Sequence, residues 1–137
     1  MTDTDTDKTF VHRAAATADG ATVRTDDAAV EAPLAMAGDS GVPDGATSPE
    51  HLMAAALAGC LQQALRVAAS SLGEESRPTV EAVVTLRTGE GVGYTAAFDL
   101  TVSGLDGEHA DDLLTQASAL CPFTTALEGR GLTVSLA

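Results

Sequence analysis

The chain has 137 residues, enough for one domain with a hydrophobic core and too few for two comfortable ones. Its 20 acidic and 7 basic residues give a formal net charge of −13. Such a field repels nucleic acid and anionic membrane surfaces, so we expect neither as a partner. Aromatic residues make up only 3% of the chain, so Ala, Val and Leu must fill the core.

The N-terminal segment MTDTDTDKTF is acidic and polar. We expect residues 1–8 to form a disordered acidic tail and residues 9–137 to form a single domain. The segment lacks the basic and apolar regions of a secretory signal, and no apolar run is expected to approach the ~20 residues of a membrane span. We therefore expect a soluble, cytoplasmic protein, in which cysteines would pair transiently if they pair at all.

Three short strand-like segments come next in the chain. Their sequences are FVHRAAAT, ATVRT and AAVEAPLAM, with turns expected at Asp19-Gly20 and at Asp26-Asp27. The stretch AGDSGVPDGAT is rich in Gly, Pro and Asp, and predicts a loop before the next element.

A long helix from about Pro49 to Ser71, ending near Gly73, is the clearest element. Thr47 and Ser48 are good N-caps, and Glu50 stands three residues after Thr47, as in a capping box. Apolar residues recur at helical spacing and predict one buried stripe, made of Met53, Ala56, Leu57, Cys60, Ala64 and Val67. The helix is unusually apolar for its length, which favours a buried, central position.

The remaining elements complete an α+β pattern. Residues 80–87 and 94–103 alternate apolar and polar side chains around the turn GEGVG, which predicts a β-hairpin with one buried face. Residues 107–129 predict a helical region that is interrupted at Cys121-Pro122, because Pro122 lacks an N–H and disfavours helix at the preceding residue. LTVSLA then closes the chain as a strand.

Three side chains are candidates for chemistry, and each also has a structural interpretation. Cys60 lies in the apolar stripe, where a buried structural cysteine is common. Cys121 begins a helical turn, where free backbone N–H groups and the helix dipole favour a thiolate. Glu50 is either a capping residue or part of a reactive site. The two cysteines form neither a C-x-x-C motif nor a zinc signature, and the scattered histidines predict no metal site.

Two motifs carry a resemblance to a known family. SPEHLMAAALAGCLQQALRVAA, followed after the hairpin by ALCPFTTALEGRGLTVSLA, resembles the OsmC/Ohr family of thiol peroxidases, and most closely its organic hydroperoxide resistance (Ohr) branch. The resemblance covers residues 14–137. It implies an OsmC-like fold, with antiparallel sheets around a long central helix in an intertwined homodimer.

The resemblance also implies roles for the three candidates, and no cofactor. Cys60 resembles the cysteine that attacks the peroxide and becomes a sulfenic acid, and Cys121 resembles the cysteine that resolves it into a disulfide. Glu50 resembles the carboxylate that holds a catalytic arginine beside the Cys60 sulfur. The implied substrates are organic hydroperoxides, including fatty-acid hydroperoxides. An external dithiol, typically on a lipoyl-bearing protein, would reduce the disulfide, in defence against oxidative stress.

Helix geometry restricts how Glu50 and Cys60 can cooperate. Ten residues of helix rise ~15 Å, so the two side chains of one helix cannot share a small site directly. Either a long arginine bridges them or Glu50 comes from a second subunit. A symmetric homodimer with crossing long helices satisfies this requirement.

The sequence departs from the Ohr pattern at one important point. That branch carries its arginine in the turn after the first strand, and here the turn at Ala18-Asp19 contains none. Either Arg13 or Arg24 replaces it, or the protein is a catalytically weakened OsmC-like protein that serves as a small-molecule binding or structural dimer module. Smaller departures are Ser48 for Asn, and Phe123-Thr124 for Tyr-Ser.

Overall fold

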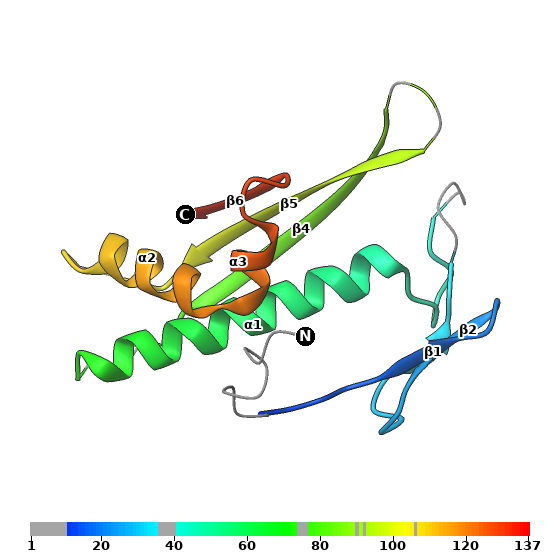
Figure 1. The fold of residues 1–137 in the computed structure, drawn as a ribbon, viewed down its shortest axis with the longest axis horizontal. Coiled ribbons are helices and arrows are strands. Elements are labelled where there is room, and N and C mark those ends of the chain that lie inside the picture. Colours follow the sequence, from blue (N-terminus) through cyan, green and yellow to red (C-terminus); the bar gives the residue numbers. More distant parts are fainter. Residues whose placement is uncertain (1–10, 36–40, 74–76, 90, 92, 106) are drawn as a thin grey trace, which may run out of the picture. The chain divides into compact units, whose positions relative to one another are not determined.

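The computed structural model describes residues 11–35, 41–73, 77–89, 91, 93–105 and 107–137 (Figure 1). They belong to two compact units, Met1–Ser48 and Pro49–Ala137. The nine elements have the predicted order, which confirms the mixed α+β class. The expected tail over residues 1–8 lies outside the described residues, and the expected single domain over residues 9–137 stays a prediction.

The first unit contains a small antiparallel sheet of β1 (Ala16–Ala18), β2 (Thr22–Thr25) and β3 (Glu31–Pro33), in that order. The predicted turn after β1 is confirmed, with Gly20 at a φ of 93°. The strands are shorter than the sequence predicts. Beyond β3 the chain makes an isolated bridge between Leu34 and Thr47, and the Leu34 N–H donates to the Ala21 carbonyl at 2.9 Å.

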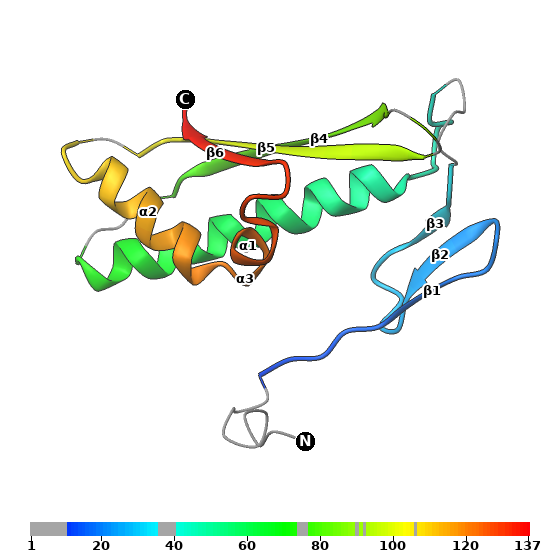
Figure 2. The same ribbon diagram turned by 45° about the horizontal axis from the view of Figure 1, so that its top comes forward.

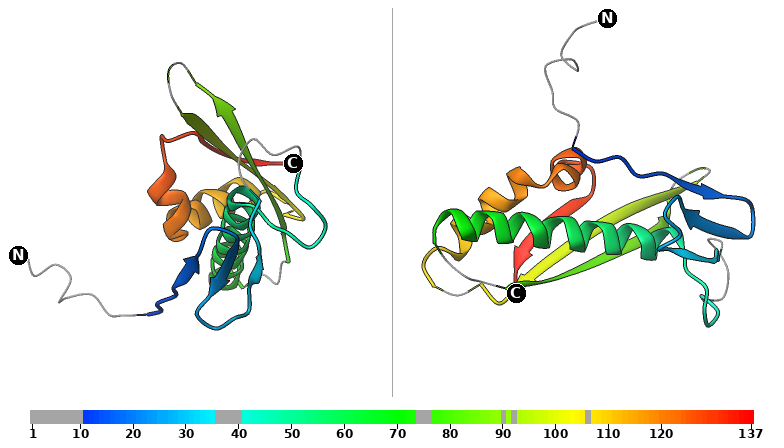
Figure 3. Two further views of the ribbon diagram at one scale, coloured as in Figure 1. Left: turned by 90° about the vertical axis from the view of Figure 1, so that its right-hand side faces the viewer. Right: turned by 90° about the horizontal axis from the view of Figure 1, so that it is seen from below.

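The second unit packs helices against one face of a three-stranded sheet (Figure 2). The sheet has the order β4 (Thr79–Thr88), β5 (Tyr94–Ser103) and β6 (Leu132–Leu136). The long helix α1 (Pro49–Ser71) lies along it, and α2 (Ala110–Leu120) and α3 (Pro122–Leu127) lie beside α1 (Figure 3).

The predicted hairpin is confirmed over its full length, from the Thr79–Ser103 pair to the Thr88–Tyr94 pair. The expectation of purely antiparallel sheets is wrong, because β6 runs parallel to β5. The chain returns to the same end of the sheet through α2 and α3, and a crossover of that length permits parallel pairing.

The core of the second unit lies between α1, the inner face of the sheet, and α2. Its fully buried members are leucines of α1 with apolar residues of β5, α2 and the α2–α3 junction. They are Leu57, Leu61, Leu65, Leu100, Val102, Ala117 and Cys121. The inner face of the hairpin alternates as predicted, with Val80, Ala82, Val84 and Phe98 packed against this cluster.

The buried face of α1 is turned from the predicted stripe. Leu61, Leu65 and Ala68 are buried, whereas Ala56 and Val67 are exposed, Val67 to 60%. Almost every position of this helix is apolar or small, so the spacing alone could not show which face packs inward. Cys60 therefore lies at the edge of the buried face and not at its centre.

By length and composition α1 is apolar enough to cross a membrane, so the expectation that no apolar run approaches a span is wrong. Core helices of soluble proteins pass the same test, and the leucine face of α1 packs into the core.

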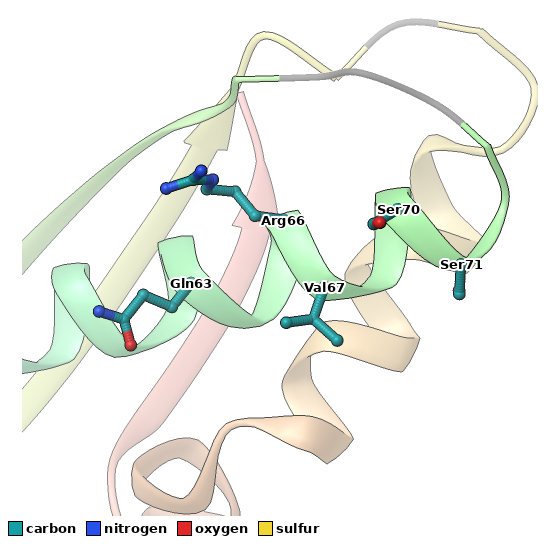
Figure 4. A pocket seen from close by; sticks show the side chains of 5 residues that line it. All are labelled: Gln63, Arg66, Val67, Ser70 and Ser71. Atoms are coloured by element: carbon teal, nitrogen blue, oxygen red, sulfur yellow. The ribbon is translucent and has the colours of Figure 1, made fainter.

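The exposed side of the last turns of α1 forms a shallow hollow of about 590 Å³, lined by Gln63, Arg66, Val67, Ser70 and Ser71 (Figure 4).

Candidate active site

The structure brings the two cysteines together. The Sγ atoms of Cys60 and Cys121 lie 2.9 Å apart, and both thiols are free. Cys60 is half-buried, whereas Cys121 has no exposed surface. A reagent from solvent would therefore meet Cys60 first, with Cys121 directly behind it.

Local backbone geometry explains why Cys121 points at Cys60. Its N–H completes the last turn of α2 by donating to the Ala117 carbonyl at 2.9 Å. Its own backbone is extended, with ψ at 115°, because Pro122 disfavours helix at the preceding residue. Pro122 then begins α3 at the first helical position, as predicted. Cys121 thus joins two helices and faces α1.

The environments of the two thiols push their pKa values apart. Burial raises the pKa of Cys60, and the hydrogen bond between Cys60 and Cys121 raises it further. The backbone N–H of Phe123 lowers the pKa of Cys60 but does not offset these two effects. Burial also raises the pKa of Cys121. The hydrogen bond with Cys60, the N–H and hydroxyl of Thr124 and the N–H of Phe123 outweigh it, so the pKa of Cys121 falls below its usual value. The prediction that a helix start favours a Cys121 thiolate agrees with this direction.

A buried hydroxyl at the same junction was not identified as a functional candidate from the sequence. Thr124 is 3% exposed, and its Oγ1 donates to the carbonyls of Ser118 at 2.7 Å and Cys121 at 3.1 Å. The exposed Thr125 Oγ1 also reaches the Cys121 carbonyl, at 3.0 Å. The signal in the sequence was the hydroxyl residue following Cys-Pro-Phe.

Glu50 is not brought to the thiol pair within this chain. It lies in the first turn of α1, ten residues before Cys60 and so ~15 Å away along the axis. It lines a small hollow of about 210 Å³ with His51, Ala54 and residues 82–84 of β4. Whether it caps α1 or serves the reaction stays a prediction.

The two arginines proposed as replacements belong to the first unit. Arg24 lies in β2, opposite Thr17 on one side and Glu31 on the other. Arg13 precedes β1 and is exposed. That either guanidinium reaches Cys60 stays a prediction. In the described part of the chain, no three His, Cys, Asp or Glu side chains gather as a metal ion would require.

Comparisons with known proteins agree with the fold. A family model described as "OsmC-like protein" matches residues 41–137. The "Organic hydroperoxide resistance protein-like" protein of Mycoplasma pneumoniae is 34% identical over 84 residues, which is 59% of this chain. That match spans 60% of the relative's own length.

Two solved structures match over nearly their whole length. The organic hydroperoxide resistance protein OhrB of Bacillus subtilis is 26% identical, with a TM-score of 0.79 over 93% of this chain and 98% of that one. The organic hydroperoxide resistance protein of Elizabethkingia anophelis, solved with thiocyanate bound, is 26% identical, with a TM-score of 0.83 over 95% and 99%. The predicted family is confirmed: this chain belongs to the OsmC-like protein family.

Proposed function

We propose that this protein is a Cys-based, dithiol-dependent peroxidase that reduces organic hydroperoxides, including fatty-acid hydroperoxides, to alcohols in defence against oxidative stress. The 2.9 Å contact between a half-buried and a fully buried free thiol carries the proposal. The names of the relatives from Bacillus subtilis and Elizabethkingia anophelis support this choice of substrate class.

The first step needs a Cys60 thiolate. The partly exposed Cys60 thiol loses its proton to water, so that the negative charge lies on its sulfur. The Cys60 sulfur attacks the terminal oxygen of the hydroperoxide and the O–O bond breaks. The departing alkoxide takes a proton from water to become the alcohol, and Cys60 becomes a sulfenic acid.

The second step forms the disulfide. The Cys121 sulfur attacks the Cys60 sulfur, the S–O bond breaks, and the departing hydroxide leaves with the Cys121 proton as water. An external dithiol, for which a lipoyl group on a protein is suitable, then reduces the disulfide by thiol exchange and becomes a disulfide itself. The complete cycle converts one hydroperoxide and one dithiol into an alcohol, water and one oxidised dithiol, with no cofactor.

The apolar environment of Cys60 supports an organic substrate. Cys60 and Met53 both pack against the hydrophobic core, and the side chains of Leu120 and Phe123 on either side of Cys121-Pro122 are 53% and 45% exposed. An alkyl or acyl chain would find apolar contacts there that hydrogen peroxide cannot use.

A homodimer is part of the proposal. The exposed side of α1 carries Ala55, Ala56, Gly59 and Val67, small and apolar residues against which a second α1 can pack closely. Since Glu50 is ~15 Å along the helix from Cys60 of its own chain, a dimer would let Glu50 of one subunit hold an arginine at the Cys60 of the other.

A second candidate is a family member whose peroxidase activity has faded, leaving a small-molecule binding or structural dimer module. The raised pKa of Cys60 favours this candidate, because little Cys60 thiolate exists at neutral pH unless a nearby cation lowers that pKa. So does the lack of an arginine in the turn at Ala18-Asp19.

Single-turnover oxidation separates the two. Fully reduced protein is mixed with one equivalent of cumene hydroperoxide, and intact mass and free thiols are followed in time. A peroxidase loses both thiols to a Cys60–Cys121 disulfide, Cys60→Ser retains its thiol, and Cys121→Ser stops at the sulfenic acid. Thiols that survive an excess of hydroperoxide would support the binding module instead.

The same assay tests Glu50. Glu50→Gln should slow the loss of the Cys60 thiol, whereas Glu81→Gln, an exposed acid of β4 used as the matched control, should not. Equal rates for the two variants would leave Glu50 with the capping role alone.

A further inference from the structure

We propose that Thr124 is a positioning residue, whose buried hydroxyl ties the first turn of α3 to the end of α2 and so holds the Cys121 sulfur in line with Cys60. The proposal rests on the proposed function, because it assigns the residue to the disulfide-forming step. Thr124 itself touches neither the peroxide nor the Cys60 sulfur in this mechanism.

The hydroxyl of Thr124 satisfies backbone groups that a helix end leaves open. The last carbonyls of an α-helix have no partner within the helix, and Pro122 prevents α2 from continuing. Thr124 Oγ1 donates to the Ser118 carbonyl at 2.7 Å and lies 3.1 Å from the Cys121 carbonyl. One side chain therefore joins the last turn of α2 to the residue that carries the thiol.

Burial makes this tie difficult to replace. Thr124 is 3% exposed, so water cannot readily substitute for its hydroxyl. Thr125 offers a contrast within the same turn, since it is exposed and its Oγ1 donates to the Cys121 carbonyl at 3.0 Å. Water can take over that bond when the Thr125 hydroxyl is removed. The two threonines are thus chemically matched and differ in burial.

The position of the Thr124 backbone links the tie to the reacting sulfur. The N–H groups of Thr124 and Phe123 stabilise the Cys121 thiolate, and the Thr124 hydroxyl also stabilises it directly. These N–H groups keep their direction only if the first turn of α3 is held in place, which the Thr124 hydroxyl does. The hydrogen bonds of the Thr124 hydroxyl therefore fix the position of the Cys121 sulfur and help to keep it as the nucleophilic thiolate.

The disulfide step is the one that depends on this geometry. The Cys121 sulfur must close from 2.9 Å to a bond of about 2.05 Å, opposite the departing hydroxide. Attack on the peroxide by Cys60, by contrast, takes place at the partly exposed edge of the buried face of α1. Loss of the Thr124 hydroxyl should slow disulfide formation and leave sulfenic acid formation unchanged.

The test follows both steps in Thr124→Val, Thr124→Ser and Thr125→Val, with one equivalent of cumene hydroperoxide and dimedone to trap the sulfenic acid. We expect Thr124→Val to consume the Cys60 thiol at the wild-type rate. We expect it to form the disulfide about tenfold more slowly, the factor for roughly 1.4 kcal/mol, with a matching rise in dimedone adduct. Thr124→Ser should restore the wild-type rate, and Thr125→Val should resemble wild type.

A second measurement does not use peroxide. The protein is equilibrated with reduced and oxidised glutathione, and the fraction of disulfide gives the effective concentration of the Cys121 thiol at Cys60. This effective concentration should fall in Thr124→Val and not in Thr125→Val. If Thr124→Val does not fold, Thr124→Ala serves in both experiments.

Three outcomes are distinct. A wild-type protein that does not react with hydroperoxide refutes the proposed function, while the glutathione equilibrium still tests Thr124. Disulfide formation and effective concentration at wild-type values in Thr124→Val would overturn the positioning role. Equal slowing of both steps would also overturn it, since that result indicates general destabilisation.

Discussion

Replacement of Gly131 by Ala tests how β6 enters the sheet. Gly131 has a φ of 87°, and a Cβ at this position would lie 2.8 Å from the Ala96 carbonyl oxygen of β5. Gly129, two residues earlier, has a φ of 75° and open space where its Cβ would be. Both glycines have a positive φ, and of the two only Gly131 lies so close to a neighbouring strand that an added Cβ would clash.

The expected magnitudes follow from these two differences. A left-handed backbone costs an ordinary residue about 1–2 kcal/mol, so Gly129→Ala should lower the free energy of unfolding by that amount. In Gly131→Ala the start of β6 must also move away from β5. That movement weakens the hydrogen bond from the Phe98 N–H to the Gly131 carbonyl, whose N···O distance in the wild-type structure is 2.8 Å. Its weakening lowers the free energy of unfolding by a further ~0.5–1.5 kcal/mol. The total for Gly131→Ala is roughly 1.5–3.5 kcal/mol.

Equilibrium urea unfolding of both variants and the wild type measures the difference directly. The linear extrapolation should give Gly131→Ala as the less stable variant, with an unchanged dependence on urea concentration. Equal free energies of unfolding for the two variants would show that the close approach at Ala96 has no energetic consequence. The reasoning about the β5–β6 contact would then be wrong.

Three further predictions concern the core, the thiol pair and the first unit. Leu61→Ala, at a fully buried position of α1, should lower the free energy of unfolding by about 2–5 kcal/mol in the same urea experiment. Cys60→Ala should raise the pKa of Cys121, because the hydrogen bond with Cys60 that lowers this pKa is lost while burial still raises it. Ultraviolet absorbance of the Cys121 thiolate, measured against pH, would show the shift. An unchanged titration would contradict the prediction. In the first unit, hydrogen bonds from the Thr25 hydroxyl and the Ala29 N–H hold the pKa of Asp27 below its ordinary value of 3.8. The ionised Asp27 carboxylate therefore stabilises the fold above pH 3.8, and this stabilisation is lost as the pH falls through the lowered pKa. Thr25→Val should raise the pKa of Asp27 in an NMR titration, and a value equal to wild type would exclude the hydroxyl as a cause.

Secondary structure was predictable where the sequence has a distinct period. Residues 80–87 and 94–103 alternate, and they form the predicted hairpin. Pro122 ends one helix and begins another as expected. The direction of β6 was not predictable, because it depends on how the chain crosses over through α2 and α3 and not on the pattern of LTVSLA itself.

The site was predictable in part, by motif and not by geometry. Nothing in the separation of Cys60 and Cys121 along the chain indicates that their sulfurs meet, and only the resemblance paired them. The helical face of Cys60 was assigned wrongly, because Ala56 and Val67 are apolar like the leucines that pack inward, and the spacing alone does not separate them. Thr124 was noted only as a departure from a motif, since a hydroxyl becomes significant once the carbonyls beside it are known.

The corrected position of Cys60 bears on the chemistry. A cysteine at the centre of the leucine face would be as buried as Leu57 or Leu61, and a hydroperoxide could not reach it. A cysteine on the opposite side of α1 could not contact Cys121, which is buried among those leucines. Only the edge of the buried face gives one sulfur both an approach from solvent and a thiol partner at 2.9 Å. A two-step thiol peroxidase needs both conditions at the same atom, whereas a binding pocket or a structural helix needs neither.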